Sequence, residues 1–239
     1  NHLAMLGKCL STAVDWSLLQ VRPKITLLKL PPHEFDFLLP EEGQQLIESI
    51  RETHWRDMVL IAMRTGLRLG ELLGLDWSDI DLHRRAIMVR HSNVYGIISS
   101  PKSNRIREVP MSPGFWAVLN ARSDTSGSVF KLPSGASVPR STAQRTIRDL
   151  CVRAGLRPIG WHVLRHTFAS HLAMAGRPIK AIQELLGHST SQMTDRYAHL
   201  SPAIRREAVD VLDDLGKTVR VKLGQQVGNQ SLLLPAPAS

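Results

Sequence analysis

The sequence predicts a mainly α-helical fold with a small antiparallel β-sheet. Three observations lead to this prediction: apolar residues recur at helical steps over most of the chain, glycine and proline punctuate these segments, and β-branched residues concentrate in residues 86–111. With 239 residues and 43% apolar composition, the chain can bury one sizeable core. We therefore expect one main domain.

The first segment is predicted to be a helix over residues 3–20, because its leucine, alanine and valine side chains form one stripe. Prolines then follow at Pro23, Pro31, Pro32 and Pro40. They predict an extended linker that ends where Pro40 opens the next helix. The expected organisation is a first helix, a linker, a main domain and a tail without sustained periodicity, in residues 1–28, 29–38, 39–216 and 217–239.

The main domain opens with a helical pattern from Glu41 to about Gly66, with a break near His54, and the pattern resumes from Arg68 to Leu73. Gly66 is the expected stop between two helices. Residues 86–111 then predict short strands joined by a Ser-Pro-Lys-Ser-Asn turn. Further helices, several opened by Ser or Pro and closed by Gly, are predicted in residues 112–122, 141–155, 162–176, 178–187 and 201–216.

The charge balance favours a polyanionic partner. The chain has 30 Lys and Arg against 21 Asp and Glu, a net charge of +9, and a sequence pI near 10.1. Its arginines are spread through the patterned helices and are not collected in a tail. This distribution is typical of a folded surface that binds phosphates.

Cys9 and Cys151 lie far apart in apolar helical patterns, so we expect packed thiols and not a disulfide or a metal site. No apolar run approaches the length of a membrane span, and the first residues lack the features of a cleaved leader. The expectation is a soluble, cytoplasmic protein with no membrane partner.

A cluster of basic side chains occurs in residues 162–176. His162, Arg165 and His166 share one helical face, and the apolar stripe occupies another. The cluster has two interpretations: a functional face that presents imidazoles and a guanidinium, or a helix start at His162 with an ordinary ion pair at Arg165. A zinc pair is disfavoured, because Val163 stands where a zinc protease has its glutamate base.

Two other basic residues have both a functional and an ordinary interpretation. Arg68 follows the helix-ending glycine, where a side chain can reach into a cleft and Glu71 can hold it, although a surface ion pair fits as well. Lys102 occupies the hairpin turn, where a lysine is usually solvated. A nucleotide site is excluded at residues 216–218, because Val211 stands where a phosphate loop needs glycine. Carboxylates are not clustered in the manner of a metal-dependent nuclease.

Tyr197 is one of 2 tyrosines in the chain and lies among small polar and charged residues. This setting predicts an exposed phenol. The question is then which ligand an exposed phenol contacts in a basic protein.

The ordered set of these motifs resembles the catalytic domain of tyrosine recombinases, the phage integrase family. The resemblance covers about residues 34–216 and is carried by "TGLRLGELLGLDWSDID", "PKSNRIREVP" and "HVLRHTFASHLAMAGRPIKAIQELLGHSTSQMTDRYAHLS". It implies the integrase catalytic-domain fold of DNA breaking-rejoining enzymes. It also implies Tyr197 as nucleophile, Glu71 and His166 as supporting residues, and a catalytic set of Arg68, Lys102, His162, Arg165 and His188.

The resemblance implies a site-specific recombinase. Tyr197 would attack a DNA phosphodiester and form a 3′-phosphotyrosyl intermediate, and strand exchange would follow without metal, nucleotide or other cofactor. His162 is the expected base or proton relay and Lys102 the expected general acid. Arg68 and Arg165, with a hydrogen bond from His188, would stabilise the charge of the transition state.

The implied partners are double-stranded DNA, a homo-oligomer on that DNA, expected to be a tetramer, and an accessory DNA-bending protein as an open option. Localisation at the nucleoid would follow. Arg145 and Arg148 are candidate DNA contacts, although a solvated helix face explains them equally well. Since residues 1–28 resemble only the last helix of the family's core-binding domain, we expect an N-terminally truncated chain with weak, salt-dependent DNA binding.

Two alternatives remain open at this point. The first is a basic DNA-binding module without catalytic activity, in which Tyr197 is only a surface residue. The second is a type IB topoisomerase-like enzyme, which relaxes DNA with similar residues. The products distinguish them, because relaxation without site preference favours the topoisomerase and cleavage at paired sites favours the recombinase.

Overall fold

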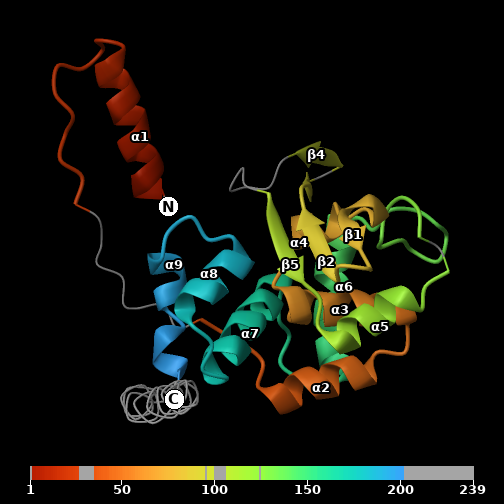
Figure 1. Ribbon diagram of the computed structural model, residues 1–239. Helices are drawn as coiled ribbons and strands as arrows, with labels where there is room; N and C mark the ends of the chain where they lie inside the picture. Colours follow the sequence, from red (N-terminus) through yellow and green to blue (C-terminus); the bar gives the residue numbers. More distant parts are fainter. Residues whose placement is uncertain (1, 27–34, 95, 100–105, 124, 202–239) are drawn as a thin grey trace, which may run out of the picture. The chain divides into compact units, whose positions relative to one another are not determined.

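The computed structural model describes residues 2–26, 35–94, 96–99, 106–123 and 125–201 (Figure 1). It divides into two compact units, Asn1–Phe35 and Asp36–Ser239. The predicted hairpin turn with Lys102, the strand residue Tyr95 and almost all of the helix predicted in residues 201–216 lie outside the described residues. Each unit is described separately.

The first unit contains helix α1 (His2–Asp15). The predicted helix over residues 3–20 is too long, because the chain turns at Ser17, whose φ is 60°. The backbone N–H groups of Leu18 and Leu19 both donate to the carbonyl oxygen of Ala13, which closes the helix. Cys9 is exposed, so the expected packed thiol is wrong there, whereas Cys151 in the second unit is buried as predicted.

The second unit is mainly helical, as predicted. Pro40 occupies the first turn of α2, and Gly66 ends α3 in the left-handed conformation with φ 64°. The break between these helices falls at residues 50–52, just before the position predicted. Within its described residues, the α-helices of this unit are α2 (Pro40–Ser49), α3 (Thr53–Thr65), α4 (Leu69–Leu73), α5 (Pro113–Asn120), α6 (Arg140–Arg153), α7 (Trp161–Met174), α8 (Ile179–Leu186) and α9 (Gln192–Asp195).

The strands form two short antiparallel sheets among the described residues, where one sheet was predicted. Strands β1 (Ile80–Asp81), β2 (Ala86–Val89) and β5 (Arg107–Pro110) pair in the order β1-β2-β5. Strands β3 (Ser92–Val94) and β4 (Ile97–Ser99) form a separate hairpin. Arg90 and His91 lie between β2 and β3, and each places a nitrogen 3.5 Å from the carboxylate of the buried Asp79 in the 3₁₀-helix η1 (Trp77–Asp79).

The core of the second unit forms around α3 and α7, which pack together. In Figure 1, α7 runs through the middle of this unit, with α8 on one side and α3 on the other. Gly66 lies where these helices meet, because a Cβ atom there would come within 2.5 Å of Phe168 Cδ1 and 2.8 Å of Leu186 Cδ2. Glycine is therefore required twice at this position, for its positive φ and for the close approach of α7 and α8.

Candidate active site

A pocket of about 300 Å³ opens where α4, α7, the end of α8 and α9 meet. It brings together side chains that lie far apart in the sequence. The predicted site residues that line it are Arg68, His162, Arg165, His166, His188 and Tyr197. Glu71 lies behind Arg68, and Lys102 lies outside the described residues.

Arg165 forms the buried floor of the pocket. Its side chain is only 2% exposed, which corrects the expectation that it shares an exposed face with His162. Its Nη1 donates to the carbonyl oxygen of Gly66 at 2.6 Å, and its Nη2 donates to that of Leu186 at 2.7 Å. These carbonyls are at the C-terminal ends of α3 and α8, where the helix dipoles are negative. Two helix ends therefore fix the guanidinium.

Arg165 remains positively charged although its side chain is buried. Burial lowers the pKa of the guanidinium to about 9, and the neighbouring charge of Arg68 acts in the same direction. A pKa of about 9 still leaves the side chain cationic at neutral pH. A fixed, poorly hydrated cation at the bottom of a pocket is a strong site for an anion.

Arg68 is held at the start of α4 by Glu71. The Arg68 backbone N–H donates to Glu71 Oε2 and Arg68 Nη1 donates to Oε1, both at 2.8 Å. The expected interaction between these residues is confirmed, and the Arg68 side chain keeps 25% exposure on the pocket wall. Arg68 can therefore reach both its carboxylate and a ligand.

Arg107 was missed by the sequence analysis. It comes from β5, and it binds Glu71 through both terminal nitrogens, at 2.7 Å from Nη2 to Oε2 and 3.1 Å from Nη1 to Oε1. Its Nε also donates to the carbonyl oxygen of Leu185 at 3.0 Å. The only available signal was its place in the motif "PKSNRIREVP", where an arginine at a strand start resembles a solvated residue. It links the sheet to α8 behind the pocket.

Glu71 is ionised although it is only 1% exposed. Burial raises its pKa, but the hydrogen bond and charge of Arg107, followed by Arg68, outweigh this and lower the pKa to about 2. The carboxylate therefore stabilises the fold above its ordinary pKa of 4.5, and this contribution is lost as the pH falls towards 2.

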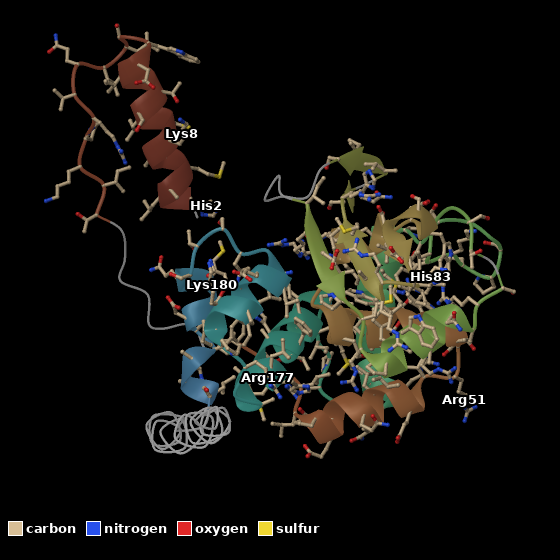
Figure 2. The ribbon with its side chains drawn as sticks, in the orientation of Figure 1. His2, Lys8, Arg51, His83, Arg177 and Lys180 are labelled. Carbon is tan, nitrogen blue, oxygen red and sulfur yellow. The ribbon has the colours of Figure 1, made fainter. Side chains whose placement is uncertain are left out.

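Glu71→Gln is expected to lower the free energy of unfolding by about 3–5 kcal/mol at neutral pH, because it leaves Arg107 buried without its counter-ion. Urea denaturation between pH 7 and pH 2 would measure this difference, which should shrink as the pH falls below about 4.5. Glu184→Gln is the matched control, since Glu184 pairs with Lys180 on the exposed surface of α8 (Figure 2). We expect Glu184→Gln to lower the free energy of unfolding by less than about 0.5 kcal/mol. Equal effects of the two substitutions would contradict this assignment.

His188 follows α8 and is half-buried. Its Nδ1 lies 2.8 Å from Oγ1 of Thr194, which is fully buried on α9. Burial lowers the pKa of His188 to about 3, and Arg165 and Arg68 act in the same direction. His188 is therefore neutral in the pocket at neutral pH.

Tyr197 is only 1% exposed, which contradicts the predicted exposed phenol. Its polar neighbours misled the prediction: Asp195 and Arg196 face solvent, whereas the Tyr197 ring turns inwards. The short α9 and the following 3₁₀-helix η2 (Ala198–Leu200), which were not predicted, bring this ring against α7. Burial raises the pKa of the phenol. Tyr197 nevertheless lines the pocket with the arginines.

Two histidines of α7 complete the wall. The His162 and His166 rings meet edge to face with centroids 5.0 Å apart. His166 Nδ1 lies 2.6 Å from the Tyr197 Oη. Burial lowers the pKa of His166 to about 4, and His162 and Arg196 add to this effect. His162 is exposed at the rim and His166 is half-buried beneath it.

A second hollow of about 410 Å³ adjoins the pocket and shares Arg68 and His162 with it. Arg148 of α6 lines this hollow, together with Gln144 one turn earlier and Arg140 two turns earlier. Arg145 is exposed on the same helix. Of the two predicted DNA contacts, Arg148 therefore lies beside the candidate site.

Within the described residues, no group of three or more His, Cys, Asp and Glu side chains is arranged to hold a metal ion. None of the helices in the described ranges combines the length and apolar character that crossing a membrane requires.

The mainly helical fold, with the three guanidinium groups of Arg68, Arg165 and Arg196, three imidazoles and a tyrosine around one pocket, defines the class of tyrosine recombinase catalytic domains. The profile of the "Phage integrase family" matches residues 36–203. The chain belongs to this family.

Known relatives are consistent with this assignment. The chain is 29% identical over 214 residues to a tyrosine recombinase XerC-like protein of Caldanaerobacter subterraneus subsp. tengcongensis, covering 76% of this chain and 55% of that protein. It therefore spans about half the length of this relative. The catalytic domain of bacteriophage HP1 integrase is 30% identical with a TM-score of 0.58, covering 74% of this chain and 95% of that structure.

A third comparison supports the fold alone, because its sequence identity is low. The Tn1549 transposon integrase in complex with a circular intermediate DNA matches with a TM-score of 0.74 and 23% identity, covering 87% of this chain and 77% of that one.

Proposed function

We propose that this chain is the catalytic part of a site-specific DNA recombinase or integrase, in which Tyr197 attacks a DNA phosphodiester. The observation that carries the proposal is the presence of the Tyr197 phenol in the same pocket as the fixed guanidinium of Arg165 and the partly exposed guanidinium of Arg68. A nucleophile beside two cations is the arrangement that phosphoryl transfer requires.

In the proposed reaction, the Tyr197 oxygen bonds to phosphorus and the bond from phosphorus to the 5′-oxygen breaks. The products are a 3′-phosphotyrosyl link and a free 5′-hydroxyl. Negative charge grows on the nonbridging oxygens in the transition state, and Arg68 and Arg165 stabilise it without a metal ion. Attack by a second 5′-hydroxyl reverses the step and joins the strands, so no nucleotide is consumed.

His188 contributes a hydrogen bond to the phosphate in this proposal. A neutral imidazole carries one proton, so its Nε2 can donate only if Nδ1 accepts. The Thr194 hydroxyl, 2.8 Å from Nδ1, supplies the donor that sets this tautomer. Thr194 lies three residues before Tyr197, and the Tyr197 backbone N–H donates to its carbonyl oxygen at 2.9 Å. One short segment therefore carries the nucleophile and orients His188.

Two proton transfers complete the scheme. His162, exposed at the rim of the pocket, is the proposed acceptor or relay for the Tyr197 proton. Lys102, which lies outside the described residues, remains the proposed general acid for the leaving 5′-hydroxyl. Glu71 supports the reaction by fixing Arg68.

Double-stranded DNA is the proposed partner. The net charge of +9 and the hollow lined by Arg148, Arg140 and Arg68 support this, and the Tn1549 integrase is described in complex with DNA. Arg145 is a further proposed contact on the exposed surface of α6. We also propose a homo-tetramer on DNA, with a DNA-bending protein as an accessory, acting at the nucleoid.

The testing experiment is covalent trapping on a nicked suicide duplex taken from the DNA that flanks the coding sequence, in EDTA. The expected result is an SDS-resistant complex that retains a label on the 3′-phosphate side of the break and releases the 5′-hydroxyl fragment. Relaxation of supercoiled DNA without site preference would instead favour a type IB topoisomerase. DNA binding without any covalent complex would leave only a DNA-binding module.

A further inference from the structure

The Tyr197 phenol is held by His166, a residue with no part in the reaction scheme above. The Nδ1 atom of His166 and the Oη atom of Tyr197 are 2.6 Å apart, with ring centroids 6.0 Å apart. His166 directly follows Arg165 on α7, so a single helix carries the floor of the pocket and the partner of the phenol.

The short distance favours one direction for this hydrogen bond. A phenolic O–H is a stronger donor than a neutral imidazole N–H, and an imidazole nitrogen is a stronger acceptor than a phenol oxygen. The pair is therefore most stable when Tyr197 donates to Nδ1 and the His166 proton is on Nε2. His166 is neutral above a pKa of about 4, owing to burial and to the surrounding His162, Arg196 and Arg165, with Asp36 acting in the opposite direction.

We propose that His166 is a positioning residue for the reaction, whose neutral Nδ1 accepts the phenolic hydrogen bond and aims the Tyr197 oxygen at the pocket floor. The inference rests on the proposed function. It assigns to His166 an orienting role distinct from that of Arg68 and Arg165, which the proposed scheme places on the phosphate.

His166 is not the final acceptor of the proton in this scheme. Burial raises the pKa of the phenol and lowers that of His166, so proton transfer from Tyr197 to His166 is unfavourable. The hydrogen bond instead restricts the ring to one orientation before DNA arrives. Holding a reactant in its reacting geometry lowers the barrier without any proton transfer.

The first test compares His166→Leu, which removes the acceptor, with His166→Asn, whose amide oxygen can take the place of Nδ1. Single-turnover cleavage at saturating DNA is expected to slow by about 10- to 100-fold in His166→Leu and to recover to within about fivefold of wild type in His166→Asn. The Kd for DNA should change by less than about twofold in both. Wild-type cleavage by His166→Leu, or equal loss in both variants, would overturn the positioning role.

His171→Leu is the matched control for a purely structural effect. His171 lies on the same helix, and its Nε2 interacts with the carbonyl oxygen of Leu38 at 2.8 Å, outside the pocket. This variant should lower the melting temperature and leave the cleavage rate of the folded protein unchanged. A rate loss in His171→Leu as large as that in His166→Leu would count against a specific role for His166.

The second test uses the DNA-free protein and detects the hydrogen bond between His166 and Tyr197 directly. Side-chain ¹⁵N NMR of the DNA-free protein is expected to show His166 at pH 7 as the Nε2–H tautomer, with an Nδ1 resonance that shifts in Tyr197→Phe. A proton on Nδ1, or no shift in that variant, would overturn the proposed hydrogen bond. If wild type forms no covalent complex, the proposed function and the positioning role both fail, whereas loss of cleavage in His166→Leu alone supports both.

Discussion

Tyr197→Phe should abolish the covalent DNA complex. The substitution removes only the hydroxyl group, so the ring can still pack against α7 and the pocket keeps Arg68, Arg165 and Arg196. Without the nucleophile, formation of the phosphotyrosyl bond is expected to fall by at least about 10⁴-fold, the scale on which loss of a catalytic nucleophile acts. Denaturing gel electrophoresis of end-labelled suicide substrate measures this directly.

The second tyrosine of the chain provides the matched control. Tyr95→Phe should form the covalent complex at the wild-type rate, because Tyr95 lies outside the motifs that carry the family resemblance. DNA affinity should stay within about twofold of wild type in both variants, since neither changes a charge. A covalent complex that persists in Tyr197→Phe and disappears in Tyr95→Phe would move the nucleophile to the other tyrosine.

The helices of the main domain could be predicted because their signals are local. Pro40 fixes the start of α2 within its own turn, and the left-handed Gly66 ends α3 without help from distant residues. Periodicity gives the approximate bounds of α6 and α7 in the same way. The separation of the strands into two sheets was not predictable, because it depends on the pairing of β2 with β5, which joins residues distant in the sequence.

The residues that line the pocket were predicted from motifs, but the burial of Arg165 and Tyr197 was not. The sequence places Arg165 on a helix face with His162, and only the packing of α3 and α8 against α7 shows that this face is covered. The same holds for Tyr197, whose polar neighbours indicate solvent although α7 receives its ring. Burial is a property of tertiary contacts, so a polar stretch of sequence does not report it.

The role of Arg107 could not be predicted from the sequence for a different reason. Its two contacts, with Glu71 and with the carbonyl oxygen of Leu185, join residues that are 36 and 78 positions away. Nothing in the local pattern of β5 distinguishes it from Arg84, which is exposed and pairs with Glu108 on the surface. An arginine with a role behind the site becomes recognisable only when the sheet and α8 are placed together.

Arg165→Lys is expected to slow cleavage by about 10²- to 10³-fold although the positive charge is kept. The guanidinium uses separate nitrogens for the carbonyl oxygens of Gly66 and Leu186 and still presents N–H groups to the pocket. Lysine has a single nitrogen, which cannot satisfy two helix ends and a phosphate in this fixed geometry. Single-turnover cleavage at saturating DNA measures the loss, with folding checked by circular dichroism.

Arg153→Lys is the control for the same substitution on the surface, because Arg153 pairs with Glu52 in an exposed ion pair. It should cleave at the wild-type rate. Both variants keep the net charge, so the slope of log Kd against log salt should not change in either. The cleavage rate and the salt slope together distinguish the effect of side-chain geometry from that of charge. A wild-type cleavage rate in Arg165→Lys would mean that positive charge alone suffices. The guanidinium geometry held by α3 and α8 would then have no part in the reaction.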